Sequence, residues 1–499
     1  MPLSESLPTR DGARRSSTGV ATTQSRREWC RPGRRVSAAA TLSAVVALGA
    51  CARPAAPAVA PSTQPLGREV PVYQPLRGDQ GRPAGPVFEN PSADLSLQDA
   101  IALALLHSPD LASFAWETRA REARLLQAGR LPNPVIGVLA EDVGADDGLG
   151  IDPGGQRIVQ PQTTIQLSQL IELGGKRSAR RGVAARDRDL AGWDYEIARI
   201  DVLTQATHGF IDVLAAQELL ALSTTTAQLV EQVEQSVAGR VEGGVVSPIE
   251  QTRAAVALAN ARVETSRARR LLETRRGRLV ASWGNSEALF RSATGDLSPV
   301  TAPPPLVELT ARLAETPALA RWTTAIAQRQ GVLALEQAKR VPDVSVTAGV
   351  RRFADFQGSA FLVGASLVLP IFDRNGGGVE EASAGVAKAY EERRAAQTRI
   401  VVALAVAYRA LASAYEEVTT LRRAVLPGAQ EAFDAVSEGY RLGKFGYLDV
   451  LDAQRTLLSA SGQYLNALAE YHKAAADIER LIGAPLNRTD NAPAPAGKE

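Results

Sequence analysis

The side chains that most often carry out chemistry in proteins are few in this chain and lie far apart. The three histidines, His107, His208 and His472, each fall on a stretch with helical periodicity. Both cysteines, Cys30 and Cys51, precede the body of the protein, which leaves no thiol pair there for a disulfide or a metal site. No His-Glu-x-x-His or paired-cysteine motif is present. The sequence therefore predicts no catalytic residue and no bound metal or cofactor.

Two aspartates follow a glycine-rich turn late in the chain. Asp449 and Asp452 come after the segment Tyr440–Gly446 and are three residues apart. At that spacing they share one face of a helix near its N-terminus. Carboxylates at that end of a helix are favourable because they complement the helix dipole, so a purely structural role is one interpretation of the pair.

An internal repeat organises the elements around these residues. The segment Ala128–Pro134 resembles Ala338–Val344 at an offset of about 210 residues, and Gln166–Gly175 resembles Ser366–Asn375 at about 200. Gly239–Gly243 resembles Gly439–Gly443, also at an offset of about 200. That alignment places Ile249 opposite Asp449. The acidic residue of the first repeat, Glu250, is then displaced from the position equivalent to Asp449. The first half also has a longer loop, which accounts for the change in offset.

Each half predicts a helix, two strands, a long helix, a turn and a returning helix. The opening helices are expected over about 95–132, broken at Ser108-Pro109, and over 306–340. Apolar residues alternate with small or polar ones over 344–350 and 361–369, and again over 136–140 and 165–167. These patterns predict two hairpins, and so four strands per chain.

Very long helices are expected over about 176–239 and 379–439. Their apolar residues recur at spacings of four and three, which is the seam of a coiled coil, so each must pair with a returning helix over about 248–283 or 447–481. Pro427 interrupts the second long helix and predicts a kink or an irregular turn. The prediction is thus a mostly α protein with a small β part.

The N-terminal region has the order of a bacterial export signal. Arginines precede a short apolar run that ends Leu48-Gly-Ala-Cys51. These last residues resemble a lipobox, in which Cys51 becomes the lipidated first residue; an ordinary signal with an incidental cysteine is the alternative. We expect a signal over 1–50, longer than needed because of a start codon placed too early, and a proline-rich lipidated tether over 51–92. Two repeats over 93–300 and 301–486 and a disordered tail over 487–499 complete the expected organisation.

Charge and hydropathy limit the possible partners. The chain has 56 basic and 54 acidic residues, a near balance that gives no case for nucleic-acid binding. We expect no later apolar run of about 18 residues, and so no helical membrane protein.

Four strands alone would leave open edges that lipid cannot satisfy, whereas three chains would supply twelve strands and close a barrel.

Two helix–hairpin–helix repeats in this order resemble the TolC family of outer-membrane efflux proteins over about residues 95–485. The motifs Glu172–Arg177 and Pro370–Gly377 are similar to the CzcC-like branch, whose members serve resistance-nodulation-division pumps that expel heavy-metal cations. The resemblance implies a homotrimer with a twelve-stranded outer-membrane β-barrel, continued by an α-helical coiled-coil tunnel across the periplasm. It also implies a lipid-anchored outer-membrane location, a periplasmic adaptor and an inner-membrane pump as partners, and passive conduction.

The resemblance also assigns residues to two functional places. Acidic residues at positions matching Asp449 and Asp452, with Glu250 beside the first-repeat position, would form a periplasmic gate that favours cations. The two turns would contact the adaptor. Their residues are Gly243, Gly244, Val245, Gly443, Lys444, Phe445 and Gly446.

Two other functions stay open from the sequence alone. A duct of the same family could carry drugs, or proteins in type I secretion, instead of metal ions. A structural coiled-coil lipoprotein of the envelope would explain the long helices and the anchor, but it would not explain paired hairpins at equivalent points of two repeats.

Overall fold

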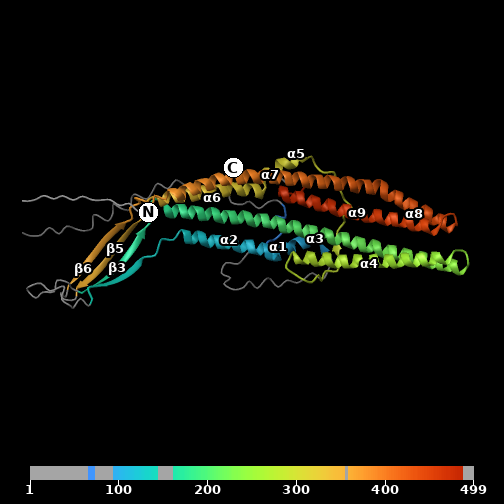
Figure 1. Ribbon diagram of the computed structural model, residues 1–499, viewed down its shortest axis with the longest axis horizontal. Helices are drawn as coiled ribbons and strands as arrows, with labels where there is room; N and C mark the ends of the chain where they lie inside the picture. Colours follow the sequence, from blue (N-terminus) through green and yellow to red (C-terminus); the bar gives the residue numbers. More distant parts are fainter. Residues whose placement is uncertain (1–65, 74–93, 144–160, 354–357, 487–499) are drawn as a thin grey trace, which may run out of the picture. The chain divides into compact units, whose positions relative to one another are not determined.

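The structure is a computed structural model that describes residues 66–73, 94–143, 161–353 and 358–486. The predicted signal, the predicted lipidation residue Cys51, most of the expected tether and the expected C-terminal tail lie outside these residues. Within the described part, each half of the chain repeats the order helix, hairpin, long helix, turn and helix (Figure 1).

The first half is built on one helix of 67 residues, α3 (Lys176–Glu242). Before it come α1 (Leu97–His107), α2 (Pro109–Ala128) and the strands β2 (Val135–Glu141) and β3 (Gln162–Ile171). After it comes α4 (Pro248–Ala281), which returns along α3. Ser96 caps α1 through the backbone of Asp99, and Ser108 caps α2 with Pro109 at its first position, so the expected break is confirmed.

The second half has the same order with two interruptions. It contains α5 (Leu306–Arg312), the 3-10 turn η2 (Leu313–Glu315), α6 (Pro317–Lys339), β5 (Val344–Phe353) and β6 (Ser359–Leu367). The long helix follows as α7 (Gly376–Thr420), the π-helical turn η3 (Leu421–Val425) and α8 (Leu426–Arg441), and α9 (Tyr447–Ile482) returns beside them.

Proline explains both interruptions. The single opening helix expected over 306–340 is wrong, because Thr316 is held extended before Pro317 and a new helix begins there. The irregularity expected at Pro427 is confirmed as the turn η3. Pro427 has no N–H to donate to the carbonyl of Arg423, and its ring would collide with that carbonyl, so the helix widens by one residue just before it.

The four long strands form one antiparallel sheet in the order β2-β3-β5-β6. The two hairpins of the repeats are therefore joined through β3 and β5, and β2 and β6 are left as edges. Two further strands were not predicted: β1 (Leu95–Ser96), where a helix was expected to begin, pairs in parallel with β4 (Ala293–Thr294).

Helix α3 is central to the packing. It contacts α1, α2 and α4, and it also contacts α6 and α9 of the other repeat (Figure 1). The main buried cluster joins α3, α4, α7 and α9 around residues such as Phe210, Leu279, Leu411 and Ile478. Because apolar residues from both halves share this core, the two repeats form one body over these helices.

One piece of the expected tether, Leu66–Tyr73, is described and is held by contacts. The Leu66 side chain is buried against α1 and α3. Arg199, which is 1% exposed, donates from Nη1 to the Leu66 carbonyl at 2.9 Å and pairs with Glu196 at 2.6 Å. The Tyr73 amide donates to the carbonyl of Leu105.

One helix of the described part is long and apolar enough to cross a membrane by length and composition. It is the continuous stretch Gly376–Arg441, with a best window of mean hydropathy 1.3, of which only 17% is buried within the single chain. The expectation that no such run exists is therefore wrong by this measure. The apolar surface arises from exposed valines on α7, including Val401, Val402 and Val406.

Candidate functional site

The two turns that reverse the long helices have the same backbone geometry. Gly244 and Gly443 adopt left-handed conformations, with φ of 69° and 71°. The next amide in each turn reaches back to a helix carbonyl at 2.8 Å: Val245 donates to Arg240, and Lys444 donates to Gly439. Both are Schellman caps, so glycine is required at these two positions by the turn itself.

This geometry corrects the expected alignment of the repeats. The matched caps pair Gly244 with Gly443, one residue away from the alignment made on Gly239 and Gly439. Glu250 then stands at the third position of α4, as Asp449 stands at the third position of α9. The first-repeat acid is thus present at the equivalent position and is not displaced.

A buried aromatic pair joins the two hairpins near their turns. The rings of Tyr440 and Tyr447 are 6.2 Å apart, and both pack into a cluster with Val237 and Ala254 of the first repeat. The guanidinium carbon of Arg240 lies 4.7 Å from the centre of the Tyr440 ring. This cation–π contact connects the end of α3 to the end of α8.

Four buried polar atoms at this end of the hairpins have no hydrogen-bond partner in the single chain. They are the hydroxyls of Tyr440 and Tyr447, Oε2 of Glu250 and Nε2 of Gln454. Burial, reinforced by the neighbouring Tyr440, raises the pKa of Tyr447 to about 12. Unpaired buried polar groups are costly, so these atoms lower the stability of the folded chain.

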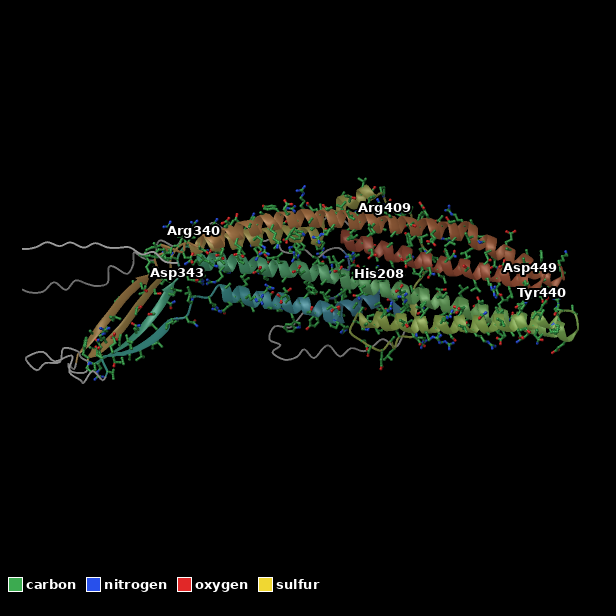
Figure 2. The ribbon with its side chains drawn as sticks, in the orientation of Figure 1. His208, Arg340, Asp343, Arg409, Tyr440 and Asp449 are labelled. Atoms are coloured by element: carbon green, nitrogen blue, oxygen red, sulfur yellow. The ribbon has the colours of Figure 1, made fainter. Side chains whose placement is uncertain are left out.

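The two predicted gate aspartates are exposed and lie on one face of α9 (Figure 2 labels Asp449 beside Tyr440). Oδ2 of Asp449 accepts a hydrogen bond of 2.8 Å from the Gly446 amide, which caps the helix. Both carboxylates border an open groove of 590 Å³ between α4 and α9, whose other side carries Arg253. Asp449 thus caps the helix, as the structural interpretation of the pair predicts, while Asp452 has no capping partner among the described contacts.

The turn residues themselves are accessible. Val245 is 66% exposed and Phe445 is 48% exposed. The Phe445 ring folds back onto Gly439. An added Cβ at this position would collide with the ring, so the ring can pack here only because residue 439 is glycine. The first repeat has Arg240 at the matching position. The two tips therefore differ in shape although their backbones agree.

The glycine motifs between sheet and helices have a clear structural role. Gly174 and Gly175 both adopt left-handed conformations, and a Cβ at Gly174 would collide with Val341 of the other repeat. Lys176 pairs with Asp343 at 2.7 Å, which joins the start of α3 to the start of β5. Asn375 occupies the matching left-handed position and donates to the Glu336 carbonyl. These motifs thus fix the strand-to-helix turns.

The histidines have structural surroundings. His208 lies within hydrogen-bond distance of the Lys473 carbonyl, 3.1 Å, and near Asp477, and His472 lies 2.8 Å from the Leu297 carbonyl. Within the described ranges, no group of three or more His, Cys, Asp or Glu side chains could hold a metal ion.

Comparison with known proteins identifies the family. The outer membrane efflux protein family matches residues 100–285 and 309–484. This chain belongs to that family. It is therefore an outer-membrane efflux channel component and not an enzyme, and the envelope-spacer alternative is set aside.

Individual members of the family show how far the likeness extends. The chain is 35% identical over 424 residues to the cobalt-zinc-cadmium resistance protein CzcC of Cupriavidus metallidurans, covering 84% of this chain and 98% of CzcC. It is 29% identical over 304 residues to the nickel-cobalt-cadmium resistance protein NccC of Alcaligenes xylosoxydans xylosoxydans, covering 60% of this chain and 66% of NccC.

Solved channel structures share the fold. The CmeC outer membrane channel of Campylobacter jejuni superimposes with a TM-score of 0.66 at 15% identity, covering 78% of this chain and 85% of CmeC. A CusC structure superimposes with a TM-score of 0.65 at 15% identity, covering 85% of this chain and 99% of the CusC chain. At this identity the likeness shows the fold alone.

Proposed function

We propose that three copies of this chain close a twelve-stranded barrel in the outer membrane. The support is the sheet itself, whose edges β2 and β6 are both unpaired in one chain. One face of the sheet carries exposed apolar side chains, with Phe361 at 91% and Val363 at 82% exposed. A sheet with two open edges and an apolar face is stable in lipid only if further strands close it.

The helices below the barrel support the same assembly. Helix α7 leaves Val401, Val402 and Val406 about half exposed in one chain. Neighbouring copies would cover the valines. In this arrangement the helices form the wall of a tunnel that continues the barrel.

The periplasmic end carries the gate. Asp449 and Asp452 from three chains, with Glu250 at the position equivalent to Asp449, set a ring of carboxylates at the hairpin turns. Such a ring favours cations and binds divalent ions at a narrow opening. The exposed residues of the turns, including Val245 and Phe445, offer the surface that a periplasmic adaptor contacts when it separates the two hairpins.

The cargo follows from the relatives. The 35% identity to CzcC, a cobalt-zinc-cadmium resistance protein, favours divalent heavy-metal cations as substrate. An inner-membrane pump of the resistance-nodulation-division type supplies the energy, and this chain conducts passively. Lipid on Cys51 anchors the protein to the outer membrane, on the evidence of the lipobox-like sequence before it.

The observation that carries this proposal is a sheet with two unpaired edges and one exposed apolar face. The same chain also forms two helical hairpins with acidic residues next to their turns. The test compares wild type with the double variant Asp449→Ala, Asp452→Ala in planar bilayers. We expect wild type to show a cation-favouring conductance that millimolar Zn²⁺ or Co²⁺ blocks, and the double variant to be insensitive. The matched control is Asp434→Ala, which removes an exposed carboxylate from α8. If the double variant is blocked as strongly as wild type, the gate assignment is wrong.

A further inference from the structure

The strand register separates the sheet into two chemically different faces. Most cross-strand rows on one face are apolar, such as Ile136, Leu167, Ala348 and Val363, and the row of Thr163, Arg352 and Ser359 is the polar exception at its outer end. Rows on the other face are largely polar, such as Ser168 beside Thr347, whose hydroxyls lie 2.9 Å apart. In the barrel proposed above, the apolar face contacts lipid and the polar face lines the lumen.

Arg351 is the cation of the polar face. In the described parts of β2, β3, β5 and β6, that face has two ionisable side chains, Arg351 and Glu141. Nε of Arg351 donates to Thr164 Oγ1 at 3.0 Å, and its Nη2 lies 3.4 Å from Oε2 of Glu141. The arginine of β5 thus reaches across β3 to β2, and its position is fixed by groups on both strands.

The pair lies at the outer end of the sheet. β2 begins after α2 and ends at Glu141, and β5 begins after α6 and carries Arg351 near its end, so both residues are far along their strands from the helices (Figure 1). Both side chains are about one-third exposed, with values of 31% for Arg351 and 37% for Glu141. Ions passing the outer mouth would therefore meet both charges.

We propose that Arg351 and Glu141 form a charge-compensated ring in the lumen near the outer mouth, a second determinant of ion selectivity beside the periplasmic gate. The inference rests on the barrel of the proposed function. Three guanidinium groups would otherwise repel the cations that leave the channel. Glu141 holds each guanidinium against the wall and cancels its charge, so the exit stays open to cations.

The test measures the K⁺-to-Cl⁻ permeability ratio from reversal potentials of the full-length protein in planar bilayers under a KCl gradient. Glu141→Gln leaves three uncompensated arginines and should lower the ratio by about twofold to fourfold near 0.1 M salt, and further near 0.01 M, where the Debye length rises from about 10 to about 30 Å. Arg351→Gln should raise the ratio by a similar factor. The double variant should return it close to wild type.

The chain offers a matched control on the next residue. Arg352 lies on the same strand but on the opposite face, in the row of Thr163 and Ser359, so Arg352→Gln should leave the ratio unchanged. Arg351→Lys keeps the charge while losing the guanidinium fork and should also stay near wild type, which separates charge from folding.

The outcomes separate this proposal from the one it rests on. If wild type conducts but neither Glu141→Gln nor Arg351→Gln changes the ratio, the ring is refuted while the barrel stands. If Arg352→Gln shifts the ratio and Arg351→Gln does not, the faces of the sheet are assigned the wrong way round and the ring is again refuted. If wild type forms no channel, the barrel fails and the ring with it.

Discussion

Removing the cation–π contact between Arg240 and Tyr440 should open the channel without an adaptor. The guanidinium carbon of Arg240 lies 4.7 Å from the Tyr440 ring centre and connects the first-repeat hairpin to the second. In the proposed gate, opening moves these hairpins apart, so the contact exists only in the closed state. The variant Arg240→Gln removes the cation and keeps a long polar side chain.

The size of the effect follows from the geometry. A cation–π contact at a partly exposed site contributes about 1 kcal/mol. Three chains that open together would lose about 3 kcal/mol of closed-state stability, which corresponds to roughly a 100-fold rise in the ratio of open to closed channels. If the chains open independently, each contributes a factor of about five.

The assay is the open probability of single channels of the purified protein without adaptor. Arg240→Lys should behave nearly as wild type because the cation is retained. Arg441→Gln is the matched control, since Arg441 is an exposed arginine at the second tip that pairs with Glu438 of its own helix. Unchanged open probability in Arg240→Gln, or an equal rise in Arg441→Gln, would refute the role of this contact.

Three further predictions concern anchoring and stability. Cys51→Ala should yield an N-terminal peptide without lipid mass by mass spectrometry, and an unlipidated wild-type peptide would contradict the anchor. Burial raises the pKa of Glu479 above its ordinary value of 4.5, so ionisation of this carboxyl destabilises the folded chain. The variant Glu479→Gln should therefore have a higher melting temperature than wild type at pH 8, and the difference should vanish below pH 4.5. A difference in melting temperature that does not depend on pH would contradict this. Tyr447→Phe removes a buried hydroxyl without a partner and should be neutral or stabilising by about 1 kcal/mol in chemical denaturation, whereas a clear loss would reveal a missed partner.

The long helices could be predicted closely because their signals are local. The first residue of α3, Lys176, follows two glycines, and that of α9, Tyr447, follows a turn glycine, so both starts are visible in the sequence. The break before Pro109 was equally clear. The matching break before Pro317 has the same Thr/Ser-Pro chemistry as Ser108-Pro109 and could have been found from it.

The details of the site could not be obtained in the same way. Gly239 and Gly439 look equivalent as letters, but Gly439 makes room for Phe445, and the left-handed cap is one residue out of that register. Only the hydrogen bonds of the turn show that Glu250 matches Asp449. The contact of Arg240 with Tyr440 joins residues 200 positions apart and depends on how the hairpins pack, which no local pattern encodes.

The central claim is that this chain assembles as a trimer that forms a channel. The most direct test is the mass of the detergent-solubilised protein, measured by light scattering on the same preparation whose single-channel conductance is recorded in bilayers. We predict three chains per particle and a cation-favouring conductance. One chain per particle, or a trimer that inserts no channel, would contradict the account.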